Sequence, residues 1–211
     1  MEKLLLLITI MLCATQISAQ ELEKDQINIH AGMAISNLRY VLEGTQKDSS
    51  PRIGIQIGLS YERLISKTKP LHFETGLYYV LKGAKLNSES DFTEKINQTQ
   101  LIIPALVHYY FGKNERFGLY GGLYYSFGMA GTSHFLNNSR TRLTEVDTYG
   151  NYSPITKSDV GVRIGVGLNL NKIVIKAGYD IGLINMFKAS VMNPDTSMYS
   201  NSITITLGFK L

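Results

Sequence analysis

Apolar and polar residues alternate with a period of two along most of the chain from Ile27 onward. This period is typical of β-strands, because successive side chains of a strand point to opposite faces. No segment shows the sustained period of an amphipathic helix. The pattern predicts an all-β chain with strands over residues 27–35, 53–61, 71–82, 98–111, 117–129, 160–168, 173–183 and 203–211.

The predicted connections between these strands alternate in length. The long ones cover residues 37–52, 83–97, 130–158 and 185–202, and the short ones cover residues 64–70, 112–116 and 170–171. An even number of strands with this alternation is typical of outer-membrane barrels, which have short periplasmic turns and longer outer loops. We therefore predict a single eight-stranded antiparallel up-and-down transmembrane β-barrel.

One face of each predicted strand is apolar and almost free of charge. Strands of about nine to eleven residues are long enough to cross a bilayer. The alternation alone leaves a second arrangement open, since a soluble lipocalin-type barrel turns its apolar face inward around an apolar ligand. We favour the outward arrangement, because Tyr and Phe lie towards both ends of the apolar face, as in the aromatic girdles of membrane barrels. The residues predicted to touch lipid include Val162, Val166, Ile175 and Leu207.

The other face of the strands carries charged residues, His, Gly and Tyr. The interior of an eight-stranded barrel is just wide enough for side chains to fill, so we expect paired charges there and no open channel. The predicted interior charge network consists of Glu62, His72, Glu74, Arg163, Lys176 and Asp180. A turn at residues 170–171 would place Arg163 opposite Gly178, with Lys176 and Asp180 as its diagonal neighbours.

The N-terminus predicts export. A basic start, an apolar run from Leu4 and a small residue at Ala19 indicate a secretory signal peptide over residues 1–19, which leaves residues 20–211 as the barrel domain. The single cysteine excludes a disulfide framework. The chain has 21 basic and 17 acidic residues, and this small, scattered excess gives no footprint for a nucleic acid.

The candidate chemistry of the polar face is weak. His30, His72 and His108 share this face but come from three strands without short spacing, so we expect interior histidines with protein partners and no zinc site. Glu62, His72 and Glu74 lie near one turn; an acid–base dyad is one interpretation, and a packed ion-pair network is the preferred one. The chain has neither a nucleophile elbow nor a phosphate-binding loop. We expect no enzyme activity, no metal and no cofactor.

The segment from Gln100 to Gly112, QLIIPALVHYYFG, resembles the PorT-like family of outer-membrane β-barrel proteins, with Ile103 and Pro104 as the residues that match its Ile-Pro motif. Shorter similarities cover residues 76–83, 159–167, 178–183 and 207–211. Gln100 and Ile102 depart from the family pattern, which has Tyr and Glu at these two places. Any role of that Glu is therefore absent from this chain.

The resemblance implies a location in the outer membrane of Gram-negative bacteria, with a structural or surface-interaction role. The implied partners are outer-membrane lipid, the barrel-insertion machinery and an unidentified protein or surface ligand at the long loops. The PorT-like name suggests an accessory role in protein secretion as an alternative. A secreted lipocalin-like binder of apolar ligands is the alternative from another class.

Overall fold

The computed structural model describes residues 25–42, 45–66, 68–87, 92–112, 116–137, 142–150, 155–187 and 197–211. The signal peptide predicted over residues 1–19 lies outside this part of the chain. Among the described residues, no helix has the length and apolar character needed to span a membrane.

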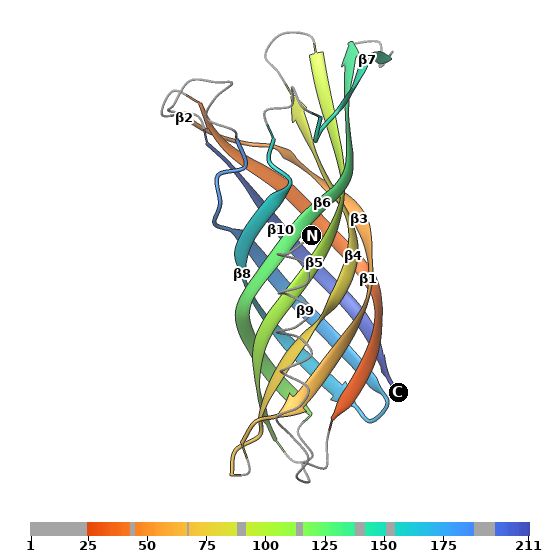
Figure 1. Ribbon diagram of the computed structural model, residues 1–211, viewed down its shortest axis with the longest axis vertical. Helices are drawn as coiled ribbons and strands as arrows, with labels where there is room; N and C mark the ends of the chain where they lie inside the picture. Colours follow the sequence, from red (N-terminus) through yellow and green to blue (C-terminus); the bar gives the residue numbers. More distant parts are fainter. Residues whose placement is uncertain are drawn as a thin grey trace, which may run out of the picture.

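Eight long antiparallel strands close into a tilted ring in the described part of the chain (Figure 1). Each strand pairs with its neighbour along the chain, and pairing of the last strand with the first closes the ring. The predicted eight-stranded up-and-down barrel is confirmed. In ring order the strands are β1 (Gln26–Leu42), β3 (Ser50–Leu64), β4 (Leu71–Asn87), β5 (Phe92–Phe111), β6 (Phe117–Asn137), β8 (Ser158–Leu170), β9 (Ile173–Gly182) and β10 (Ser197–Lys210).

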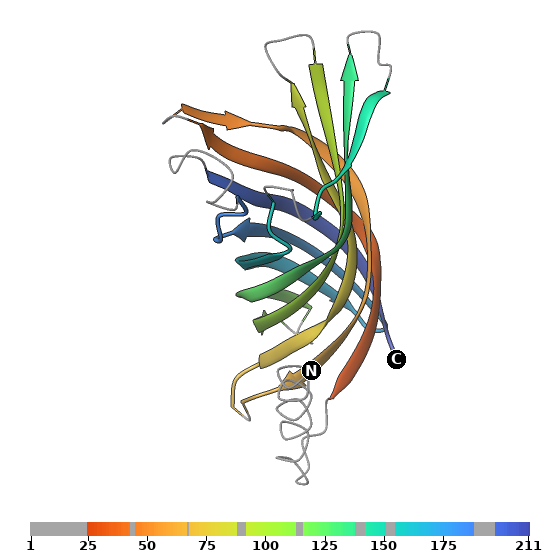
Figure 2. The same cartoon turned by 45° about the horizontal axis from the view of Figure 1, so that its top comes forward.

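Two short strands extend the ring at the end that carries the long connections. β2 (Thr45–Asp48) pairs with the end of β1, and β7 (Arg142–Asp147) pairs with the end of β6. Figure 2, with this end turned forward, shows the ends of β4, β5, β6 and β7 rising above the rest of the ring. The strands therefore extend into much of the predicted connections over residues 37–52, 83–97 and 130–158. Apolar and polar residues do not alternate clearly in these segments, so the sequence pattern did not predict them as strands.

The two short hairpin turns test the predicted register. Across the turn at residues 112–116, Phe111 pairs with Phe117, as predicted. Across the next short turn Leu170 pairs with Ile173, so the turn residues are 171–172 and the predicted turn at residues 170–171 is wrong. The physical reason is Asn171, which has a φ of 52°, a left-handed conformation that Asn tolerates better than Leu does.

The apolar strand faces point away from the ring. Val166 is 53% exposed and Leu207 57% exposed, and Ile175 is exposed on the same face. Val162 is half-buried between its strand neighbours Leu123 and Ile181. This arrangement contradicts the lipocalin alternative, which needs the apolar side chains inside.

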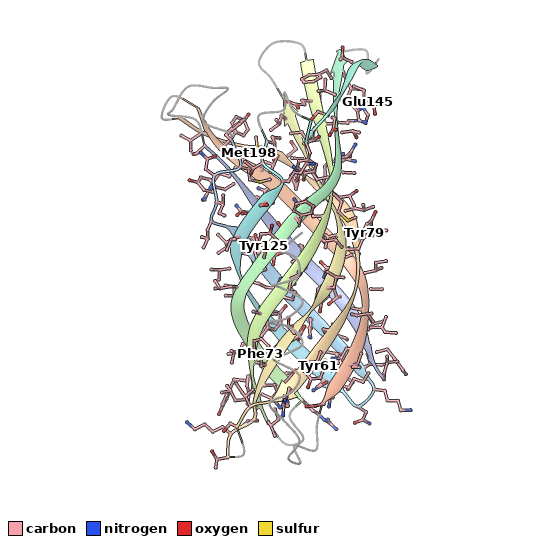
Figure 3. The ribbon with its side chains drawn as sticks, viewed as in Figure 1. Tyr61, Phe73, Tyr79, Tyr125, Glu145 and Met198 are labelled. Carbon is pink, nitrogen blue, oxygen red and sulfur yellow. The ribbon has the colours of Figure 1, made fainter. Side chains whose placement is uncertain are left out.

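The exposed apolar surface forms a band around the barrel. Its aromatic edges include Tyr61 and Phe73 near the short-turn end, and Tyr79 and Tyr125 higher up, as Figure 3 shows. On β6 the apolar face runs from Phe117 to Met129. At about 3.3 Å per residue and a tilt of about 40° this distance is roughly 30 Å along the barrel axis. A band of this height matches the hydrocarbon core of a bilayer.

Candidate functional site

The interior contains an ion pair between neighbouring strands β8 and β9. Arg163 Nε lies 2.5 Å from Asp180 Oδ1, and Arg163 Nη2 lies 2.9 Å from Asp180 Oδ2. Ser202 donates a further hydrogen bond to this carboxylate at 3.1 Å. The prediction that Arg163 lies opposite Gly178 is wrong, because the turn at residues 171–172 places Asp180 directly across from Arg163. The direct pairing allows the two-point contact that a guanidinium makes best.

Glu74 on β4 gathers a second group of interior side chains. Its carboxylate accepts hydrogen bonds from Lys176 Nζ and from Tyr78 Oη, the latter at 3.0 Å, and it lies 2.8 Å from His108 Nε2. Glu74 and His108 are each about 1% exposed. A buried carboxylate is costly unless its oxygens are paired, and here each oxygen has a partner.

Two of these contacts cross the barrel. In the ring order, β4 and β9 lie on opposite walls, with three strands between them in either direction. Lys176 on β9 reaches Glu74 on β4, and Lys82 on β4 lies 3.8 Å from Asp180 on β9. Residues at two heights therefore brace opposite walls across the interior, which leaves little room for a continuous passage between them.

Aromatic rings fill the space around these ion pairs. The guanidinium of Arg163 lies 5.8 Å from the ring centroid of Tyr78 and 5.9 Å from that of Tyr124. Nearer the short-turn end, the rings of His108 and Tyr120 stack at 4.9 Å between centroids. The tyrosines of this group are all buried. Cations over aromatic faces and stacked rings pack this part of the interior densely with polar and aromatic groups.

A cluster that we call the outer cap closes the interior at the long-connection end. Segments after β7 and after β9 fold over the ring here, joined by a bridge between Ile155 and Phe187 and by a hydrogen bond from Thr156 N to Met186 O at 2.8 Å. Met198, labelled in Figure 3, belongs to this end. The buried members of the cap are Leu38, Ala84, Ile96, Tyr149, Ile155, Met186 and Met198.

Tyr149 is fixed in the outer cap by two glycines of β6. A Cβ atom at Gly128 would lie 2.3 Å from Tyr149 Cζ, and a Cβ at Gly131 would lie 3.0 Å from Tyr149 Cε2. The backbone holds the segment as well, since Thr148 N donates to Gly131 O at 2.9 Å. Burial raises the pKa of the Tyr149 hydroxyl to about 12.

The structure brings residues of the predicted network into contact: Arg163 pairs with its predicted neighbour Asp180, and Glu74 pairs with Lys176. Glu62 and His72 contact each other at 3.3 Å near the short-turn end, whereas Glu74 lies directly across from Glu62 but turns to Lys176. Asp159, which the sequence reasoning missed, is buried and accepts a hydrogen bond from Tyr124 at 3.3 Å. It lies one residue before the alternating run predicted over residues 160–168, on the same side of the strand as Arg163, and this position was the available signal.

The motif residues Ile103 and Pro104 lie in the middle of β5. Ile103 is half-exposed on the outer face, and Pro104 is fully buried on the inner face. The β4–β5 register is the same on both sides of Pro104, so the strand carries no bulge there. Proline has no N–H to donate to the ladder, but its carbonyl oxygen is paired, since Thr75 Oγ1 donates to Pro104 O at 2.8 Å.

The described residues contain no group of three or more His, Cys, Asp or Glu side chains that could hold a metal ion. The interior histidines lie instead beside other partners: His30 Nε2 is 2.9 Å from Ser60 Oγ. Within this part of the chain, the arrangement can brace and close a barrel.

Comparisons with known proteins agree with this architecture. The family model described as "Outer membrane protein beta-barrel domain" matches residues 18–188. The chain therefore belongs to this family, and it is an integral protein of the Gram-negative outer membrane. The sequence matches no curated protein.

Solved structures show the same type of barrel. Neisserial surface protein A (NspA) is 14% identical, with a TM-score of 0.51 over 90% of this chain and 100% of that chain. Ail, the attachment invasion locus protein of Yersinia pestis, is 16% identical, with a TM-score of 0.48 over 88% of this chain and 99% of that chain. OprG from Pseudomonas aeruginosa is 16% identical, with a TM-score of 0.45 over 88% and 95%. At such identities the likeness to NspA shows the fold alone.

Proposed function

We propose that this outer-membrane barrel is a closed, non-enzymatic scaffold that holds β-hairpins above the cell surface for contact with other molecules. The observation that carries the proposal is the contrast between its two parts. The interior is braced by Glu74–Lys176 and Lys82–Asp180 and covered by the outer cap. The strands nevertheless continue beyond the apolar band, and β6 pairs with β7 there.

A braced and capped interior does not itself require strands that continue this far beyond the apolar band. Extended, paired strands above a membrane present an ordered surface, because the ladder of backbone hydrogen bonds between β6 and β7 holds the two strands together. The predicted signal peptide supports the export that this role requires. The PorT-like resemblance within the family remains a prediction.

The test shortens the largest hairpin. Residues 134–145 are replaced by Asn-Gly, which forms a tight hairpin turn between paired residues Ser133 and Val146. Cells lacking the protein are complemented with the full or the shortened chain and compared for attachment to surfaces and for resistance to detergent. We expect the shortened barrel to assemble and to preserve detergent resistance but not attachment. Equal attachment with both chains would contradict the surface role and leave a structural one.

A further inference from the structure

The outer surface of β3, β4, β5 and β6 changes character directly above the apolar band. Lys85 on β4 pairs directly across from Lys95 on β5, and Lys95 in turn pairs across from His134 on β6. The three residues lie on the outward face, because Ala84, Ile96 and Ser133 beside them are the buried, inward ones. We call these three residues the cationic row.

Such a row is unfavourable by itself. Side chains directly opposite in an antiparallel pair have Cβ atoms about 5 Å apart, and like charges there destabilise the sheet. Within the described part of the chain, neither Lys85 nor Lys95 has a carboxylate within salt-bridge distance. His134 lies 3.7 Å from Glu145 of β7, so the acid at this end reaches the histidine and not the lysines. An anion beside Lys85 and Lys95 would remove the repulsion.

A groove of about 460 Å³ lies directly below the cationic row. Its apolar lining includes Ile53, Ile55 and Leu81. Its polar lining is formed by Thr99, Lys82 and Gln98 beside them and by Arg52, Asn97 and Thr132 above them. Ile53 is 72% exposed, so an apolar surface at this height has no cover from the chain itself. The lining thus changes from apolar to polar to cationic within a few residues along the strands.

Two β-bulges border this groove. One lies in β3 between Pro51 and Gln56, and the other adds Met129 to β6 opposite Thr99. Bulges of this kind re-aim side chains. At the first bulge Arg52 lies over Gly83, where a Cβ would be 3.3 Å from Arg52 Cδ, and its guanidinium donates to Asn97 Oδ1 and, at 3.3 Å, to Ile96 O. The guanidinium is thereby held at the upper edge of the apolar lining.

The height of the groove above the upper aromatic edge indicates which part of the lipid layer surrounds it. Leu81 of the lining is two residues beyond Tyr79 of the upper aromatic edge on β4, which is roughly 5 Å along the barrel axis at the rise and tilt used above, and Lys85 lies four residues, roughly 10 Å, beyond Leu81. Figure 3 shows Glu145, at the end of the row, above Tyr79 on the same side of the barrel. The groove therefore opens at the level where lipid chains end and headgroups begin.

We propose that this groove and the cationic row bind one phosphorylated lipid of the outer leaflet. An acyl chain lies on Ile53, Ile55 and Leu81, and the phosphate lies between Lys85 and Lys95, with Arg52 below it. Basic pockets beside apolar membrane surface recognise anionic headgroups in this way. The carboxylates of Glu145 and Asp147 on β7 limit the site on its far side. The proposal rests on the outer-membrane location but not on the attachment role.

The test uses the whole barrel, purified in detergent and analysed by native mass spectrometry with added lipid A that carries two phosphates. We expect one retained lipid, and about tenfold weaker retention in Lys85→Gln/Lys95→Gln. Ala130→Leu, which adds volume at the exposed edge of the lining, should weaken retention severalfold without a change of charge. Arg39→Gln/Lys172→Gln, which removes the same charge elsewhere, should stay within twofold. Unboiled gel mobility checks that each variant is folded.

Three results would overturn the proposal. Lipid A without phosphates could be retained to the same extent as the phosphorylated form, which would exclude the cationic row as the headgroup site. The control variant could lose as much as Lys85→Gln/Lys95→Gln, which would reduce the effect to net charge. Inorganic phosphate could displace lipid A at equal concentration, which would make a soluble anion the occupant. None of these outcomes affects attachment by cells, so failure of this site and failure of the surface role are distinguishable.

Discussion

At the scale of single residues, Asp180 brings two interior cations to one buried carboxylate. Its carboxylate contacts Arg163, Ser202 and Lys82. Replacement by Ala leaves a buried guanidinium without its anion, which costs about 3–5 kcal/mol for a buried pair. We expect Asp180→Ala to lower the free energy of unfolding in urea by this amount. Asp25→Ala, which removes a partly exposed partner 3.7 Å from Arg63, should cost less than about 1 kcal/mol. Similar losses in both variants would contradict the network.

Residues on the outer face should be sensitive to depth. Val162 pairs with Leu123, midway between Phe117 and Met129 on β6, whereas Val166 pairs with Leu119, nearer the short-turn edge. An Arg on the lipid face costs roughly 2–4 kcal/mol at the midplane and little near the interfaces. We therefore expect Val162→Arg to destabilise the folded barrel more than Val166→Arg.

Assembly yield and urea unfolding in vesicles measure this order, with Val162→Leu as the control. Cysteines at the two positions should react with lipid-soluble probes and resist water-soluble ones. The opposite labelling pattern would contradict an outward apolar face.

At the scale of elements, the seat of Tyr149 on β6 holds the outer cap in place. Gly128→Val would place side-chain atoms where the Tyr149 ring lies. We expect the ring to leave and the amide of Thr148, which donates to Gly131 O, to exchange its hydrogen faster, while the barrel itself stays folded. Gly167→Ala is the control, since a Cβ there meets its nearest atom only at 3.9 Å. Unchanged exchange at Thr148 would show that the glycines do not hold the cap.

The hairpin of β5 and β6 should respond to pH through Glu94, which lies beyond the apolar band. Burial raises the pKa of this carboxyl above its ordinary 4.5, and a hydrogen bond from Ser133 opposes the shift. Because the folded pKa is the higher one, the hairpin binds its proton more tightly when folded, and its stability falls as the pH rises from about 4.5 through the raised pKa. Glu94→Gln should abolish this loss. Hydrogen exchange of the hairpin, corrected for intrinsic rates, measures it, and an equal pH response in both chains would contradict the assignment.

The elements also show how far the sequence can be interpreted. Alternation found all eight ring strands, because a membrane enforces an apolar face along each of them. It missed β2 and β7, which lie beyond the apolar band. The alternation along each strand placed Glu74 and Lys176 on the inner face. It did not show that β4 and β9 form opposite walls, because the position of a strand in the ring depends on all eight strands together. The predicted register of β8 against β9 was wrong because the turn lies at residues 171–172, with Asn171 in the left-handed conformation, and not at residues 170–171.

At the scale of the whole molecule, the interior determines whether the barrel conducts. Ion pairs join β4 to β9 at two heights, Tyr78, Tyr120 and Tyr124 fill the space between them, and the outer cap covers the end. Water and ions would need a path between these buried ion pairs and rings. We therefore expect the purified chain to give no stable large conductance in planar bilayers. The double variant Glu74→Ala/Asp180→Ala, which removes both braces, should unfold at lower urea concentration well before it conducts, because the tyrosines remain. A steady, wide, water-filled conductance of the unmodified chain would contradict the closed barrel and require a wider ring than eight strands provide.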